Sequence, residues 1–285
     1  MLEAILNYNF MQNALFAALL SSVVCGLIGT IIIEKRLVMM SGGIAHSSFG
    51  GIGLGYFLGF EPIIGALIFS GVASVAVATI KRKTNTNTDT FIGILWSIGM
   101  ALGIIFIAIT PGYPPEITSY LFGDILTVSN TDILMMLILV TIVTFSIFSF
   151  FNYWKAYLFD ETFSFVIGLK TAVMEYLMFL LIGLTVVVLI KVVGLILVIA
   201  LLTAPPAIAR LFTYNLKKMM ALSVLLGALF GFFGLLLSYE FNIASGATII
   251  LLAGASYFVS IFIKSTLEKR KKKISFSQVN NQFKN

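Results

Sequence analysis

The sequence is poor in charged residues, and it contains one cysteine and one histidine. Only 11% of its 285 residues are charged, whereas a soluble domain carries about 25%. Hydrophobic residues make up 59% of the chain and its mean hydropathy is +1.06. Because a soluble fold cannot accommodate so much apolar surface, the sequence predicts a membrane protein. The single cysteine, Cys25, excludes an internal disulfide.

The motifs of soluble enzymes are missing too. No glycine is followed by a lysine, so the chain lacks a G-x-x-x-x-G-K-[ST] phosphate-binding loop and cannot hydrolyse ATP by that route. One histidine supports neither a nucleophile–His–acid site nor a zinc site of the usual Cys/His spacing. The net charge of +6 does not indicate a nucleic-acid partner, because the basic residues cluster at the ends of apolar runs. We therefore predict that the chain is not an enzyme and binds no nucleic acid.

Apolar runs long enough to cross a bilayer recur along the chain. A transmembrane helix needs about 20 predominantly apolar residues. On that basis we predict an all-α polytopic membrane protein with about nine transmembrane helices, or eight if the run around Lys191 is one long bent helix. The predicted spans cover residues 11–33, 38–59, 62–80, 91–110, 131–151, 172–190, 192–209, 217–238 and 244–263.

The basic residues predict how the bundle is oriented. With the N-terminus outside and the C-terminus inside, all but one of the 18 Lys and Arg residues fall on the inner side, as the positive-inside rule requires. The exception is Lys191, and removing the break there would scatter this bias. We expect a transmembrane permease domain over residues 1–265. Residues 266–285 form a basic, disordered cytoplasmic tail, in which Lys269–Lys273 lie beside anionic membrane lipid.

Three polar segments join the spans. Lys81–Thr90 is expected to be a solvated inner turn, and Pro111–Thr131 an outer loop with a short surface helix over residues 117–126. Asn152–Lys170 is an inner loop that is rich in aromatic residues, which a solvated loop does not need. We interpret it as a membrane-surface or partner-docking helix. Its aromatic residues include Trp154, Tyr157, Phe159, Phe163 and Phe165.

The stretch Ser41–Gly59 combines apolar residues with His46 and many glycines. Gly51, Gly55 and Gly59 lie four residues apart, a spacing that lets transmembrane backbones pack closely. An ionisable residue at membrane depth is a candidate functional residue, so we predict that His46 lines a translocation route. The alternative is a packing histidine bonded to neighbouring backbone or to Ser47.

Two further features lie in the second half of the chain. Pro205 and Pro206 fall inside a predicted span, where they are expected to kink the helix and free backbone carbonyls. Glu175 and Lys191 lie near the ends of spans, and we expect them to form interhelical pairs or to snorkel.

Several of these segments resemble one family. Arg36–Gly59 resembles the second-span motif of the metal-ion uptake permeases of ATP-binding-cassette transporters, the membrane subunits of zinc, manganese and iron importers. The segments Ser119–Leu126, Lys191–Arg210 and Ser245–Ile249 resemble later motifs of that family, and the likeness covers about residues 15–265. The residues that match the family's ATPase-contacting inner loop are Phe159, Asp160, Glu161, Phe163 and Gly168.

The resemblance implies a function, an assembly and a location. The chain would be the permease subunit of an ATP-driven importer in the plasma membrane, moving a divalent zinc, manganese or iron ion by alternating access. It would act as a homodimer, with a separate ATPase docked on Lys155–Lys170. An extracytoplasmic metal-binding protein would deliver the ion to the side of Glu116 and Asp124. The chain itself would hold no cofactor, since the metal is its substrate and ATP binds the partner.

One position departs from the family pattern. The family has an aspartate four residues before the histidine, and here that residue is Gly42. Because divalent cations prefer an anionic oxygen ligand beside imidazole, another group has to contribute, the metal is held weakly, or the substrate differs. Ser47, Glu116 and Asp124 are further candidates for the metal pathway.

Two other functions stay open. The same architecture could import an organic substrate such as a vitamin or a siderophore. An ion-coupled secondary transporter is less favoured, because such carriers usually need intramembrane carboxylates.

Overall fold

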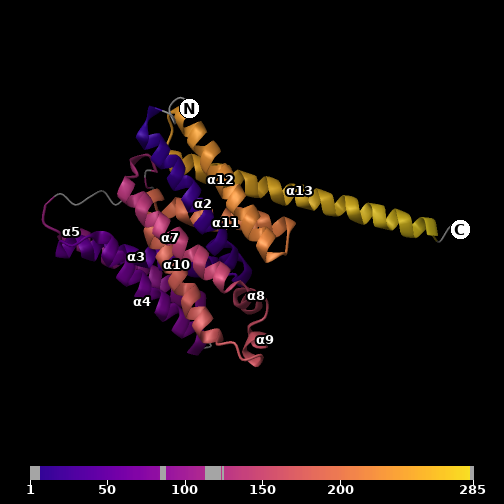
Figure 1. Ribbon diagram of the computed structural model, residues 1–285, viewed down its shortest axis with the longest axis horizontal. Helices are drawn as coiled ribbons and strands as arrows, with labels where there is room; N and C mark the ends of the chain where they lie inside the picture. The colour runs from indigo at the N-terminus through magenta and orange to yellow at the C-terminus, as the bar shows by residue number, and fades with distance from the viewer. Residues whose placement is uncertain (1–6, 84–87, 113–122, 124, 283–285) are drawn as a thin grey trace.

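The computed structural model describes residues 7–83, 88–112, 123 and 125–282. Among these residues every element is helical, and the helices pack as a bundle from which the end of α13 projects (Figure 1). The elements are α2 (Asn9–Lys35), α3 (Val38–Leu58), α4 (Pro62–Lys83), α5 (Thr88–Ile109), η1 (Ile125–Thr127), α7 (Asn130–Ser149), α8 (Phe151–Phe159), α9 (Glu161–Val166), α10 (Thr171–Val193), α11 (Leu195–Phe212), α12 (Leu216–Phe241) and α13 (Ser245–Gln282).

The all-α membrane architecture is confirmed. Eight helices are long and apolar enough to cross a membrane, namely α2, α4, α5, α7, α10, α11, α12 and α13. The remaining predicted span is α3, which has 21 residues and is rich in Gly and Ser. It packs against α4, α5 and α10. Its low hydropathy therefore reflects a helix that is surrounded by other helices rather than by lipid.

Three local predictions from the sequence have different outcomes in the structure. The break predicted at Lys191 lies at Gly194, between α10 and α11, where φ is +81°. Glycine adopts that conformation without a steric penalty, so the chain turns there and not at the lysine. α13 continues as a helix through the segment expected to be a disordered tail. The surface helix predicted over residues 117–126 lies mostly outside the described residues, which include part of η1 there.

Glycines bring α3 into backbone contact with α4. A Cβ added at Gly51 would lie 2.0 Å from the carbonyl oxygen of Gly65, and one at Gly55 would lie 2.6 Å from the Cα of Pro62. Gly59 does not pack against another helix as Gly51 and Gly55 do. A Cβ there would meet no atom within 4 Å, and its φ of +74° ends the helix as a left-handed C-cap. Gly59 therefore terminates α3 and does not pack it.

A second set of small residues brings α5 onto another face of α3. A Cβ at Gly99 would lie 2.4 Å from the Cα of Ser47, and one at Gly53 would lie 2.5 Å from the carbonyl oxygen of Gly103. Only glycine allows two helices to approach so closely. α3 is thus held between α4 and α5 by backbone contacts.

The proline pair lies buried inside α11, which stays one helix across it. Pro206 has no N–H, so the carbonyl of Leu202 loses its helical donor. That carbonyl oxygen would lie 2.4 Å from a Cβ added at Gly29 of α2. The Leu202 carbonyl therefore lies against α2. A residue larger than Gly29 would obstruct this crossing of α2 and α11.

Charged pairs tie the helices together at the two ends of the bundle, as expected for Glu175 and Lys191. The Glu175 carboxylate is 1% exposed and accepts from Lys81 at 2.5 Å and Arg82 at 2.9 Å. Lys191 lies 3.3 Å from Asp132 and 3.7 Å from Glu61. These pairs link α10 to α4 at one end and to α7 and the start of α4 at the other.

We predict that Glu175→Gln lowers the free energy of unfolding by about 2–3 kcal/mol. Breaking a buried ion pair costs about 3–5 kcal/mol, and the loss here is smaller because Lys81 and Arg82 are partly exposed. The matched control is Glu268→Gln, which removes an exposed pair with Lys264 at 3.9 Å worth under about 0.5 kcal/mol. Thermal unfolding of the purified protein in detergent measures both, and equal losses would contradict the prediction.

Candidate functional site

His46 lies on α3, half-buried, with its ring against α5. The imidazole stacks on the indole of Trp96, with ring centroids 3.9 Å apart and planes 9° from parallel. Its Nδ1 is buried and has no hydrogen-bond partner. The Ser47 hydroxyl donates to the Ile44 carbonyl at 2.9 Å, so it does not engage the imidazole as a donor. Stacking thus orients the ring while Nδ1 stays free of a protein partner.

The face of α3 that carries His46 is partly covered within one chain, where Gly42 is buried and His46 is half-buried. Met39, Gly42 and His46 share this face, since residues three, four and seven apart align on a helix. Met39 is 54% exposed, and a Cβ at Gly42 would meet no atom within 4 Å. There is room for a larger side chain one turn before His46.

A run of small residues lies on an exposed face of α5. Gly93, Ser97 and Ala101 recur every fourth position, and all three are exposed. They flank Trp96, whose ring covers His46. Small residues on an exposed helical face allow a second helix to approach. The sequence did not predict this run or the stacking of Trp96 on His46. The one available signal was that Trp96 is the only tryptophan inside a predicted span.

Of the other predicted pathway residues, only Ser47 lies in the described part of the chain. Ser47 packs α3 onto α5 at Gly99, and Glu116 and Asp124 lie outside the described residues. Within the described part of the chain, no group of three or more His, Cys, Asp or Glu side chains could hold a metal ion. Among the described residues, a metal at His46 would therefore not find a preformed cluster of such side chains.

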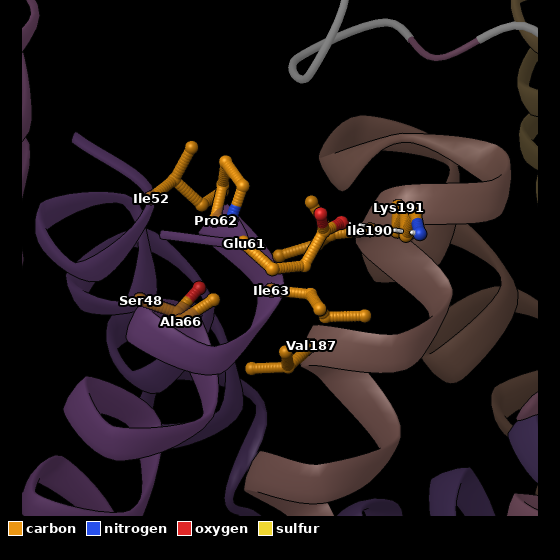
Figure 2. A pocket seen from close by; sticks show the side chains of 9 residues that line it. All are labelled: Ser48, Ile52, Glu61, Pro62, Ile63, Ala66, Val187, Ile190 and Lys191. Carbon is orange, nitrogen blue, oxygen red and sulfur yellow. Dashed lines mark ion pairs between the residues drawn. The ribbon is translucent and has the colours of Figure 1, made fainter. Parts of the chain in front are cut away.

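A small cavity lies on another side of α3 (Figure 2). It has a volume of about 30 Å³ and is lined by Ser48 and Ile52 of α3 and by the start of α4 and the end of α10. The ion pair between Glu61 and Lys191 lies beside it. A space of this size holds one or two water molecules. Because Ser48 is two residues from His46, the cavity and the imidazole lie on different faces of the helix.

The inner-loop prediction corresponds to α8 and α9, which expose aromatic side chains at one end of the bundle. Phe159 and Phe163 are 60% and 58% exposed. The Asp160 carboxylate caps α9 by accepting from the Phe163 backbone N–H at 2.8 Å, and Gly168 follows with a φ of +85°. These residues form a protruding turn that is held in shape by its cap and its glycine.

Buried contacts anchor this turn to the bundle. Trp154 and Tyr157 are fully buried, although the sequence analysis grouped them with the surface aromatics. Burial raises the pKa of the Tyr157 phenol well above its usual range. Lys35 of α2 lies 3.8 Å from the centre of the Tyr157 ring and 3.1 Å from Glu161. A force on α9 would therefore reach α2 directly.

A bundle with eight helices long and apolar enough to cross a membrane, among the described residues, is the architecture of a polytopic membrane protein. The chain matches the model of the ABC 3 transport family over residues 7–264. It belongs to that family, the membrane permeases of ATP-binding-cassette transporters, and the resemblance drawn from its motifs is confirmed. It is therefore a multi-pass protein of the plasma membrane.

Its relatives cover almost the whole chain. It is 44% identical over 264 residues to an uncharacterized membrane protein of Synechocystis sp., covering 92% of this chain and 94% of that one. It is 34% identical to the manganese transport system membrane protein MntC of Listeria monocytogenes, over 91% and 92% of the two chains. Among solved structures, PsaBC from Streptococcus pneumoniae in complex with Fab matches with a TM-score of 0.85 and 33% identity, over 95% and 98% of the chains.

We predict that Gly42→Ala and Gly43→Ala have different effects on stability. Gly42→Ala should leave the free energy of unfolding unchanged or raise it by up to about 1 kcal/mol, because space is available and alanine favours helix. A Cβ at Gly43 would lie 2.3 Å from the Cγ2 of Ile92, a stiff β-branched side chain, so overpacking should cost about 1–3 kcal/mol. Thermal unfolding of both variants measures this, and equal stabilities would contradict it.

Proposed function

We propose that the chain is the permease subunit of an ATP-driven importer that carries a divalent transition-metal ion past His46. The observation that carries this proposal is the unpartnered Nδ1 of His46, one turn from the free space beside Gly42. The proposal is supported by the membership of the family and by the manganese transport proteins among the relatives. We place manganese first among the candidate ions, ahead of zinc and iron.

The ligands available at His46 favour weak, transient binding of a metal ion over tight binding. Imidazole binds first-row transition ions, whereas manganese also favours carboxylate, carbonyl and water oxygens. With glycine at position 42, the face of α3 offers no carboxylate beside His46. A single imidazole would hold the ion weakly, and a transport route requires binding weak enough to let the ion leave.

A second copy of the chain would complete the route. Space for a larger side chain is free beside Gly42 of α3, and the small residues Gly93, Ser97 and Ala101 of α5 are exposed. Packing two chains through these α5 faces would enclose the two His46 side chains between them. A homodimer would thereby supply a second imidazole in place of the missing carboxylate.

An ATPase on one side of the membrane would drive transport, and a binding protein on the other side would supply the metal ion. We assign the turn made by Phe159, Asp160, Glu161, Phe163 and Gly168 to docking of the ATPase. Closure of the ATPase would be transmitted through the Lys35–Glu161 pair to α2, giving alternating access. With the N-terminus outside, the binding protein would deliver metal to the opposite end of the bundle, near Glu116 and Asp124.

Metal accumulation by cells that express the full transporter tests the proposal. His46→Ala should reduce manganese accumulation at least about tenfold, since even outer-shell partners of a metal site are worth about 10–100-fold. Gly42→Asp should supply a carboxylate on the same face, strengthen binding and change the order of preference among manganese, zinc and iron. Ser48→Ala, which lines the separate cavity, is the control and should accumulate metal normally.

The same assay separates the alternatives. Unchanged uptake of all three metals in His46→Ala would remove His46 from the mechanism. Uptake of an organic chelate but of no free metal would favour the organic-substrate function. Uptake that persists without the ATPase and collapses with the proton gradient would favour a secondary transporter.

Docking of the ATPase is tested by co-purification. Phe163→Ala should reduce the ATPase bound to the permease by about tenfold or more, because exposed aromatic anchors commonly contribute over 1 kcal/mol to an interface. Phe212→Ala is the matched control, since Phe212 is 49% exposed and lies outside the turn. Equal retention of the ATPase by both variants would place the docking surface elsewhere.

A further inference from the structure

A groove runs between α7 and α12 on the outside of the bundle. α2 packs against both helices (Figure 1) and forms the floor of the groove. The groove has a volume of about 720 Å³, within the range of roughly 300–1,000 Å³ that is usual for small-molecule sites. It is lined by Val23 and Leu27 of α2, Thr144 and Phe148 of α7, Phe151 and Asn152 of α8, and Lys217, Met220, Ala221 and Val224 of α12.

One end of this groove is basic. Phe151 and Lys217 also line a second hollow of about 370 Å³, which includes Lys155, Tyr214 and Asn215 and borders the proposed ATPase-docking turn at Phe159. The Lys217 ammonium lies 5.1 Å from the centre of the Phe151 ring, where the groove and the hollow meet. Among the described residues that line either of them, none is acidic. The combined surface is apolar along the helices and positively charged where it ends.

Two further features favour an anion at that end. The hollow lies at the N-terminus of α12, where Asn215 caps the helix by accepting from the Lys218 backbone N–H at 3.2 Å. Helix N-termini carry a partial positive charge and bind phosphate groups. Within the groove, the Thr144 hydroxyl is buried and has no hydrogen-bond partner. An ester carbonyl would accept from it.

We propose that this groove binds one phospholipid with an anionic headgroup. An acyl chain lies between α7 and α12, and the phosphate lies beside Lys155, Lys217 and the first turn of α12. Basic pockets next to transmembrane helices attract anionic headgroups, and the apolar length of the groove requires a ligand with a hydrocarbon chain. A soluble anion would leave that length empty. The proposal does not depend on which substrate the protein transports.

Native mass spectrometry of the full chain, purified in detergent and titrated with dioleoyl lipids, tests the proposal. The wild type should retain phosphatidylglycerol in preference to phosphatidylcholine. Lys217→Gln should lower that preference by about fivefold, the effect of one basic residue beside an anionic headgroup. Lys218→Gln is the matched control, because it removes the same charge from the same turn but does not line the groove. The preference of this control should not change.

A second variant tests the apolar part. Ala221→Trp fills the groove and should reduce retention of both lipids, while Leu229→Trp on the same helix, which does not line the groove, should not. Phosphatidylglycerol should also raise the Tm of the wild type more than that of Lys217→Gln.

Three outcomes would overturn the proposal. The first is equal retention of the two lipids by the wild type, which means that detergent or any lipid fills the groove. The second is an equal effect of the Lys217 and Lys218 variants. The third is a loss of dimer in Ala221→Trp with lipid retention unchanged, which would make this face a contact with a second copy of the chain.

Discussion

α3 is held between α4 and α5 by backbone contacts that only glycine permits. Gly51 and Gly65 face each other so closely that a Cβ on either would lie about 2 Å from the other's carbonyl oxygen. A glycine-rich helix has little intrinsic stability, and neighbouring helices have to hold it in place. Because both faces of α3 are held by backbone contacts, the helix behaves as a rigid support. A side chain that projects from its free edge is placed accurately.

The position of His46 follows from that support. The contact of Gly99 with Ser47 brings α5 close enough for Trp96 to stack on the imidazole. Stacking orients the ring without occupying Nδ1, which a hydrogen bond would have done. The free space beside Gly42 leaves room for a larger side chain one turn before the imidazole. Weak, oriented coordination is what the proposed transport step requires.

Ion pairs join the helices at both ends of the bundle. At one end, Lys35 joins the protruding α9 turn to α2 through Glu161, and Glu175 joins α10 to α4. At the other end, Lys191 lies between Glu61 and Asp132. Ion pairs at both ends of α10 resist sliding of this helix relative to its neighbours. A movement that opens one end would have to break or exchange one of these pairs.

Apolar length and charge position are local properties of the chain, so the sequence predicted the all-α membrane fold and most of the spans to within a few residues. For Glu175 and Lys191 it left interhelical pairing and snorkelling as alternatives. It did not determine that Gly59 ends α3, that the chain breaks at Gly194, or that Trp154 and Tyr157 are buried. Nor did it indicate Trp96 beside His46 or the groove between α7 and α12. Those features depend on which helices become neighbours, and only the tertiary packing decides this, since many pairings satisfy the same pattern of apolar residues.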